Sequence, residues 1–157
     1  MLTQYLTIFF ISMVPLIELR GAIPIAIGMG LDPIVSMVIC VIGNMLPVPI
    51  IYMFARRFLV WGAQRRWIGK ICRFFLEKGE RAGRKLTAKT GRWGALVGLM
   101  LFVGLPIPGT GAWTGTLAAS FLDMGPKATA LAVSLGVIMA GTIMTIVSVL
   151  GLHIFGL

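Results

Sequence analysis

The sequence predicts an all-α integral membrane protein, and three observations lead to this prediction. Hydrophobic residues make up 58% of the 157 residues and charged residues only 12%, whereas soluble domains carry about 25% charged residues. Apolar runs alternate with Gly- and Pro-rich breaks, and most of the 14 Lys and Arg residues lie within residues 56–92. Because the chain is too short for two independent cores, we expect a single membrane domain over residues 1–157.

The first half combines two short apolar runs with one long run. Residues 2–17 form a run that Pro15 interrupts, and residues 22–31 form a second short run. Since about 20 apolar residues are needed to cross a bilayer, these runs predict a re-entrant helical hairpin. Residues 34–55 are long enough to span the membrane and end on Arg56 and Arg57, with a kink expected near Pro47.

The basic segment, residues 56–92, predicts an amphipathic helix between the two halves. Trp67, Ile71 and Phe74 recur at helical spacing among Lys and Arg residues, a pattern typical of helices that lie on a membrane surface and contact anionic lipids. Positively charged loops mark the cytoplasmic side. We therefore expect this segment in the cytoplasm and both termini outside, with the bilayer rather than nucleic acid as its partner.

The second half, residues 93–157, repeats the pattern of the first, residues 1–55. A break at residues 106–116 precedes a short run to Leu122 and an apolar span at residues 128–150. Residues match at offsets of 90 to 93: Pro15 with Pro106, Gly21 with Gly111, Asp32 with Asp123, Pro33 with Pro126, and Gly43 with Gly136. This order predicts an inverted repeat of two re-entrant hairpins, each followed by a transmembrane helix, as in many secondary transporters.

Charges within the apolar halves indicate a functional site. Glu18, Arg20 and Asp32 are the only charged residues among the first 55. An ionisable group at membrane depth costs about 2.5–3.5 kcal/mol and faces a protein interior or a wet cavity. We expect the helices that begin after Gly21 and Gly111 to point their N-termini at one another near the midplane, a setting that suits an anion.

The candidate site residues have specific expected roles. We expect Glu18 to couple proton movement and Arg20 to bind an anionic head group through its fork of donors. Alternatively, the two side chains pair, or satisfy the broken backbone structurally. Residues of the two breaks complete the expected substrate site: Gly21, Pro24, Pro108, Gly109, Thr110, Gly111, Trp113 and Thr114.

Three further polar residues are secondary candidates. Asp32 and Asp123 lie beside turn residues, and a helix cap is the alternative role for each of them. Asn44 lies within the first span, where its amide could form hydrogen bonds with the backbone of the breaks or with another helix.

Several function classes are not expected from this sequence. It contains one His remote from any Ser or Cys partner and no Gly-rich loop followed by Lys and Ser or Thr, so we expect neither an enzyme nor an ATP-driven pump. Cys40 and Cys72 are the only cysteines, too few for a metal site. No cofactor is expected. A homo-oligomer is an alternative, because one chain of this length has few residues with which to enclose a transport pathway.

Two motifs carry a resemblance to a known family. Residues 18–24 read Glu-Leu-Arg-Gly-Ala-Ile-Pro, and residues 106–115 read Pro-Ile-Pro-Gly-Thr-Gly-Ala-Trp-Thr-Gly. With the basic segment between them, they resemble the small multidrug export proteins of bacteria and archaea over nearly the whole chain. That family is similar to the DedA and VTT membrane proteins, whose fold is an inverted repeat of re-entrant hairpins and transmembrane helices. The resemblance implies a multi-pass protein of a prokaryotic plasma membrane.

The resemblance and the residues together lead to three functional hypotheses. The first is a proton-linked secondary transporter or flippase for an amphipathic, anionic substrate that resembles a lipid phosphate, as the DedA relatives imply. The second is proton-coupled export of small hydrophobic drugs or cations, as the family name implies. The third is a membrane scaffold without transport. Gly111 stands where the DedA pattern has an arginine, which leaves Arg20 as the candidate for head-group binding.

Overall fold

The computed structural model describes residues 2–15, 17–66, 68–107 and 110–155, and these residues form seven helices and no strand. The all-α prediction is therefore confirmed. The helices are α1 (Leu2–Met13), α2 (Glu18–Gly28), α3 (Pro33–Met45), α4 (Val48–Ala63), α5 (Gly69–Gly104), α6 (Ala112–Phe121) and α7 (Pro126–Phe155).

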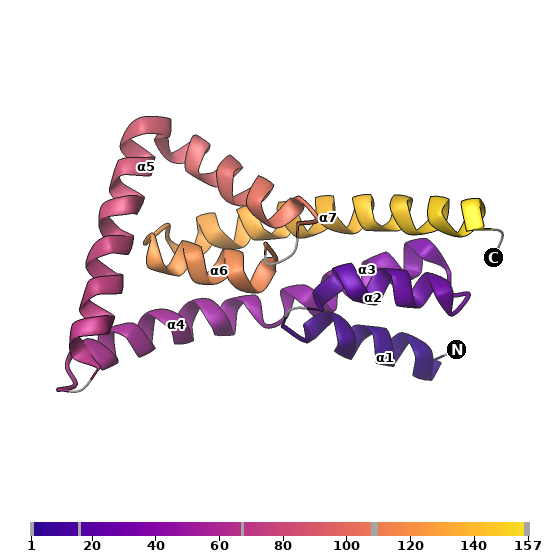
Figure 1. Cartoon of the computed structure of the whole chain (residues 1–157), viewed down its shortest axis with the longest axis horizontal. Coiled ribbons are helices and arrows are strands. Elements are labelled where there is room, and N and C mark those ends of the chain that lie inside the picture. Colours follow the sequence, from indigo (N-terminus) through magenta and orange to yellow (C-terminus); the bar gives the residue numbers. More distant parts are fainter. Residues whose placement is uncertain (1, 16, 67, 108–109, 156–157) are drawn as a thin grey trace.

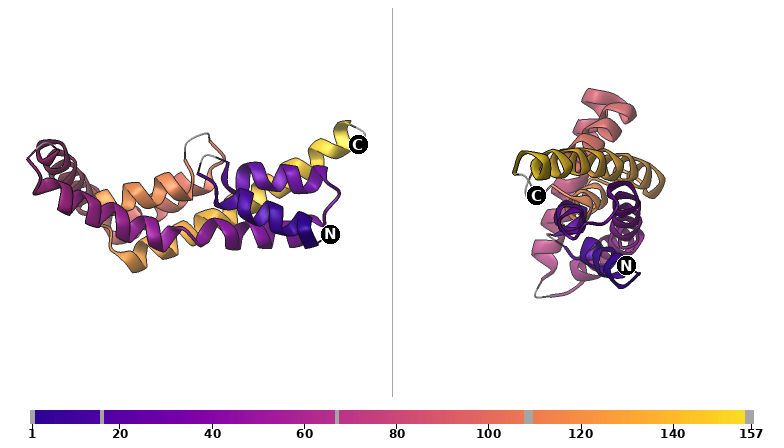
Figure 2. Two further views of the ribbon diagram at one scale, coloured as in Figure 1. Left: turned by 90° about the horizontal axis from the view of Figure 1, so that it is seen from below. Right: turned by 90° about the vertical axis from the view of Figure 1, so that its right-hand side faces the viewer.

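The molecule is elongated along the direction of α4 and α7 (Figure 1). The first part of α5 lies across one end of the molecule, and both termini lie at the opposite end. Figure 2 shows α1, α2 and α3 side by side at the terminal end, where each of these helices packs against the other two. α7 contacts α2, α3, α5 and α6 and so joins the two halves of the chain.

Two helical runs are long and apolar enough to cross a membrane, Pro33–Ala63 with 31 residues and Pro126–Ile154 with 29. The first run comprises α3 and α4, which are separated at Leu46 and Pro47, where a kink was expected. The expected end at Arg57 was wrong, because α4 continues to Ala63. Arginine is a good helix former, so its charge alone does not end a helix.

α5 covers most of the basic segment and turns sharply at Gly91. Gly91 has φ 71°, a left-handed conformation that glycine adopts at little cost. The arms on either side of it run in very different directions (Figure 1). The amphipathic helix was expected over the basic segment, residues 56–92, but the first part of that segment belongs to α4, which ends at Ala63, and α5 begins at Gly69.

Helices α2 and α6 end in the same way. Gly30, after α2, and Asp123, after α6, both have positive φ, 74° and 55°. In each case the next N–H donates to a carbonyl oxygen five residues back, at 3.1 Å, which is the closure of a Schellman motif. Asp32 then caps α3, because its Oδ1 accepts from the Val35 N–H at 2.8 Å.

A glycine of α7 allows close contact with the last part of α5. A Cβ on Gly136 of α7 would lie 2.7 Å from the carbonyl oxygen of Met100 and 2.8 Å from Cβ of Val103. The helix backbones therefore pass at a distance that no larger residue allows. This crossing fixes the end of α5 against α7.

Candidate functional site

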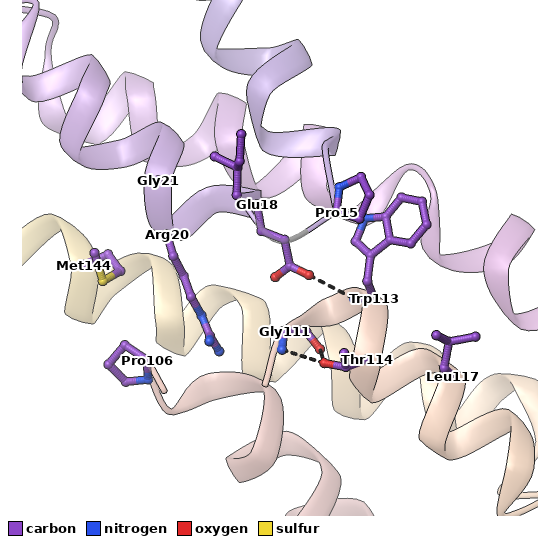
Figure 3. A pocket seen from close by; sticks show the side chains of 11 residues that line it. Pro15, Glu18, Arg20, Gly21, Pro106, Gly111, Trp113, Thr114, Leu117 and Met144 are labelled. Carbon is purple, nitrogen blue, oxygen red and sulfur yellow. Dashed lines mark hydrogen bonds between the residues drawn. The ribbon is translucent and has the colours of Figure 1, made fainter. Parts of the chain in front are cut away.

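The two breaks meet at a cavity of about 480 Å³. Its walls come from the α1–α2 turn, the α5–α6 connection, the first turns of α2 and α6, and α7 (Figure 3). The lining residues are Pro15, Ile17, Glu18, Arg20, Gly21, Pro106, Gly111, Trp113, Thr114, Leu117 and Met144. The cavity thus brings together residues of both motifs that lie about 90 positions apart in the chain.

Glu18 caps helix α6 from across the cavity. Its Oε2 accepts from the Ala112 N–H at 3.2 Å, and its Oε1 accepts from the Trp113 N–H at 3.1 Å. The carboxylate is buried, with the residue only 6% exposed. A negative charge at a helix N-terminus is stabilised by the free N–H groups and by the helix dipole. The carboxylate therefore occupies an anion site built by α6.

Gly111 makes this close approach feasible. A Cβ at position 111 would collide with all three atoms of the Glu18 carboxyl group. Thr114 completes the turn, because its Oγ1 accepts from the Gly111 N–H at 2.8 Å and donates to the Gly111 carbonyl at 3.2 Å. The N-cap position of α6 carries no side chain of its own, so the capping acceptor comes from α2.

We predict that Gly111→Ala separates Glu18 from α6. The added methyl group takes the space of the carboxylate, so both capping hydrogen bonds lengthen and stability falls by about 2–3 kcal/mol, the range for a hydrogen bond to a charged group plus local strain. Thermal unfolding of the purified protein measures the loss. Gly98→Ala is the matched control, since a Cβ there meets nothing within 4 Å; equal melting temperatures for the two variants would contradict the prediction.

Arg20 holds the other side of the break. Its guanidinium donates to carbonyl oxygens of Val103 at 3.0 Å, Leu105 at 2.8 Å, Ile107 and Thr110. It also donates to the Thr110 hydroxyl at 3.2 Å. The C-terminal end of α5 leaves carbonyl groups without helical partners, and Arg20 satisfies them. In this conformation both terminal nitrogens of the guanidinium donate to the chain itself.

Glu18 and Arg20 therefore stabilise the second break from both sides. Glu18 binds the N–H groups that begin α6, and Arg20 binds the carbonyl groups that end α5. α2 was expected to begin after Gly21, but it begins at Glu18. This difference places both charges in the first turn of α2, where they project together towards the cavity (Figure 3).

Trp113 joins α6 to α1. Its indole N–H donates to the carbonyl oxygen of Met13, the last residue of α1, at 3.2 Å. Its backbone N–H is bound to Glu18, and its ring lines the cavity. Trp113 therefore connects the end of α1, the start of α2 and the start of α6 at one point.

The other predicted residues lie in different settings. Pro24 is inside α2 and does not line the cavity. Asn44 is 1% exposed on α3, and neither polar atom of its amide has a hydrogen-bond partner among the described residues. Asp32 and Asp123 lie at helix ends outside the cavity. Pro108 and Gly109 lie outside the described residues.

Sequence reasoning missed several residues that line the cavity. Pro15 and Pro106 were noted only as breaks, while Leu117 and Met144 were not singled out. Leu117 lies one helical turn after Trp113, so the face of α6 that carries Trp113 also carries Leu117. That spacing is the signal that could have found it, whereas Met144 comes from α7 and gives no local signal.

The described residues define the class of protein: a helical fold with two runs long and apolar enough to cross a membrane and a charged cavity between its halves. The chain belongs to the family described as "Putative small multi-drug export protein", whose match covers residues 18–143. That match begins at Glu18 and includes every residue of α2 to α6 and part of α7. Neither a curated protein nor a solved structure matches the chain.

Proposed function

We propose that this protein is a proton-linked secondary transporter or flippase for an amphipathic substrate with an anionic head group. In this proposal the chain forms an inverted repeat of two re-entrant hairpins and two spans in a prokaryotic plasma membrane. The basic arm of α5 lies on the cytoplasmic side and contacts anionic lipids. Membership of an export family and the two apolar runs support a transport role in a membrane.

The observation that carries the proposal is the position of the Glu18 carboxylate. It accepts from two backbone N–H groups at the N-terminus of α6, inside a cavity. Those groups recognise any carboxylate- or phosphate-like oxygen. A substrate head group would therefore compete with Glu18 for the same two donors, so Glu18 leaves the site when the head group enters.

A proton accompanies this exchange. Once displaced from α6, the Glu18 carboxylate no longer accepts from the two amides. The proton binds to a carboxyl oxygen of Glu18, and the head group accepts hydrogen bonds from the N–H groups of Ala112 and Trp113. Arg20 supplies a positive charge near the head group, and its hydrogen bonds to carbonyl oxygens stabilise the conformation of the break.

Proton-coupled export of a hydrophobic cation is the second candidate. The family description favours this candidate, and Glu18 is the single carboxylate among the residues that line the cavity. In this mechanism the drug and the proton compete for Glu18. Arg20 opposes it, because a fixed positive charge on the same helix turn repels a cation.

Flux in proteoliposomes tests the proposal. We expect purified protein to move labelled lysophosphatidic acid between leaflets at least tenfold faster than protein-free vesicles, with proton uptake in the same direction. Glu18→Gln should abolish the proton coupling, whereas Glu77→Gln, on the exposed surface of α5, should retain it. Proton release driven by tetraphenylphosphonium without lipid movement would replace the proposal with the second candidate. Absence of any flux would leave the scaffold hypothesis.

A further inference from the structure

A second cavity of about 470 Å³ adjoins the charged one. It lies between α4, the beginning of α5 and α6. Its walls include Phe54 and Phe58 of α4, Ile71 and Cys72 of α5, and Trp113 and Leu117 of α6. We call this cavity the apolar chamber, and its volume is in the range of small-molecule sites.

Among the described residues that line it, the chamber offers a ligand no charged group. Its lining side chains are aliphatic or aromatic apart from the thiol of Cys72. The one other polar atom, the indole nitrogen of Trp113, already donates to the Met13 carbonyl. A polar ligand would lose its hydration there without gaining hydrogen bonds. The chamber therefore suits hydrocarbon.

Trp113 and Leu117 line both cavities. They lie four residues apart on one face of α6, so this face of the helix lies at the boundary between the charged cavity and the chamber. The backbone N–H of this same Trp113 belongs to the anion site that Glu18 occupies. A head group at the start of α6 would thus have its chain directed towards this boundary.

The chamber also opens towards the surface that lipid chains would contact. Phe54, Phe58 and Ile71 line it and yet remain 68%, 47% and 59% exposed. Phe54 and Phe58 stack on one another, with ring centroids 6.1 Å apart. Large exposed apolar side chains of this kind are expected to face hydrocarbon in a membrane protein. A chain can therefore enter the chamber sideways.

We infer that the apolar chamber binds the hydrocarbon chain of the amphipathic substrate while its anionic head occupies the Glu18 site. The inference rests on the proposed function and adds the second half of the substrate site. The occupant is one linear chain carried by an anionic head, because the described lining of the chamber is apolar and the chamber adjoins a site for an anion.

Protection of Cys72 tests this inference. The Cys40→Ser chain keeps Cys72 as its only cysteine, and the rate of its modification by methyl methanethiosulfonate in nanodiscs is measured. Dodecyl phosphate should slow the modification at least fivefold, whereas inorganic phosphate, and dodecanol at the same mole fraction, should change it less than twofold. Equal protection by dodecanol would overturn the inference, because the chain would then bind without its head.

A filled chamber provides the second measurement. Ala55 lines the chamber and is 8% exposed, so Ala55→Trp places an indole ring where the chain would lie. We expect this variant to lose at least tenfold in affinity for dodecyl phosphate. Ile50→Trp is the matched control, because Ile50 is on the same helix, 64% exposed and outside the chamber; it should bind as the parent chain does.

The two proposals fail in different ways. If Glu18→Gln abolishes proton-coupled lipid movement but dodecyl phosphate leaves Cys72 unprotected and Ala55→Trp transports normally, the chamber is not the chain site and the proposed function stands. If dodecyl phosphate protects Cys72 while Glu18→Gln transports like the parent, the chamber binds the chain and the proton-linked mechanism is wrong.

Discussion

Arg20→Ala is expected to cause the largest loss of stability among substitutions at the cavity. Arg20 donates to four backbone carbonyl oxygens, those of Val103, Leu105, Ile107 and Thr110. Without the guanidinium, the carbonyl oxygens of Leu105 and Ile107 keep hydrogen bonds from within the break, whereas those of Val103 and Thr110 lose the donor that Arg20 provides. A buried polar group left unsatisfied costs about 1–3 kcal/mol. Because the loop relaxes in part, we expect Arg20→Ala to lower the free energy of unfolding by about 3–5 kcal/mol.

Thermal unfolding followed by intrinsic fluorescence measures this loss. For a chain of this length the expected decrease in melting temperature is about 10 °C. Arg57→Ala is the control, since Arg57 is exposed on α4, and it should change stability by less than about 0.5 kcal/mol. Arg20→Lys should fall between them, because one ammonium group cannot match the planar fork of donors. Equal melting temperatures for Arg20→Ala and Arg57→Ala would contradict this role.

Glu18→Gln is expected to have the second largest effect. The substitution removes the negative charge at the N-terminus of α6 and places an NH₂ group opposite the Ala112 or Trp113 N–H. One capping hydrogen bond is therefore lost. Hydrogen bonds to charged groups contribute about 1.5–3 kcal/mol, and a partly buried charge at a helix end contributes up to about 2 kcal/mol. We expect a total loss of about 2–3 kcal/mol, because these two contributions overlap.

The same unfolding measurement applies to Glu18→Gln, with Glu77→Gln as the control on the exposed surface of α5. Glu18→Ala should lose at least as much stability, because it leaves both N–H groups unsatisfied. The account would be wrong if Glu18→Gln and Glu77→Gln unfolded at the same temperature.

The partners of Glu18 and Arg20 could not be read from the local sequence. Membrane depth and the Gly and Pro residues nearby predicted that the two charges lie in a protein interior or a wet cavity; Glu18 is buried, and Arg20 is half-buried beside the same cavity. The atoms that they contact lie more than 80 residues away, so these contacts depend on tertiary packing. A hint was nevertheless present, because α6 has Gly111 at its N-cap and no acidic residue in its first turn. Such a helix needs an acceptor from elsewhere.

Boundaries and cavities were harder to predict. Arg57 does not end α4, because arginine is compatible with a helix. The turn at Gly91 depends on a positive φ that a glycine within a helical pattern does not reveal by itself. The apolar chamber needs side chains from α4, α5 and α6 at once, and no single segment carries a pattern for it.

Amide hydrogen exchange at the start of α6 tests the central claim most directly. In nanodiscs, the amides of Ala112 and Trp113 should exchange slowly in the parent chain, because Glu18 accepts from both. Glu18→Gln should raise their exchange rate at least about tenfold, consistent with loss of a charged hydrogen bond. Dodecyl phosphate should then restore slow exchange in this variant, since its head group takes the place of the carboxylate. Equal exchange in the two chains, or no protection by dodecyl phosphate, would contradict the claim.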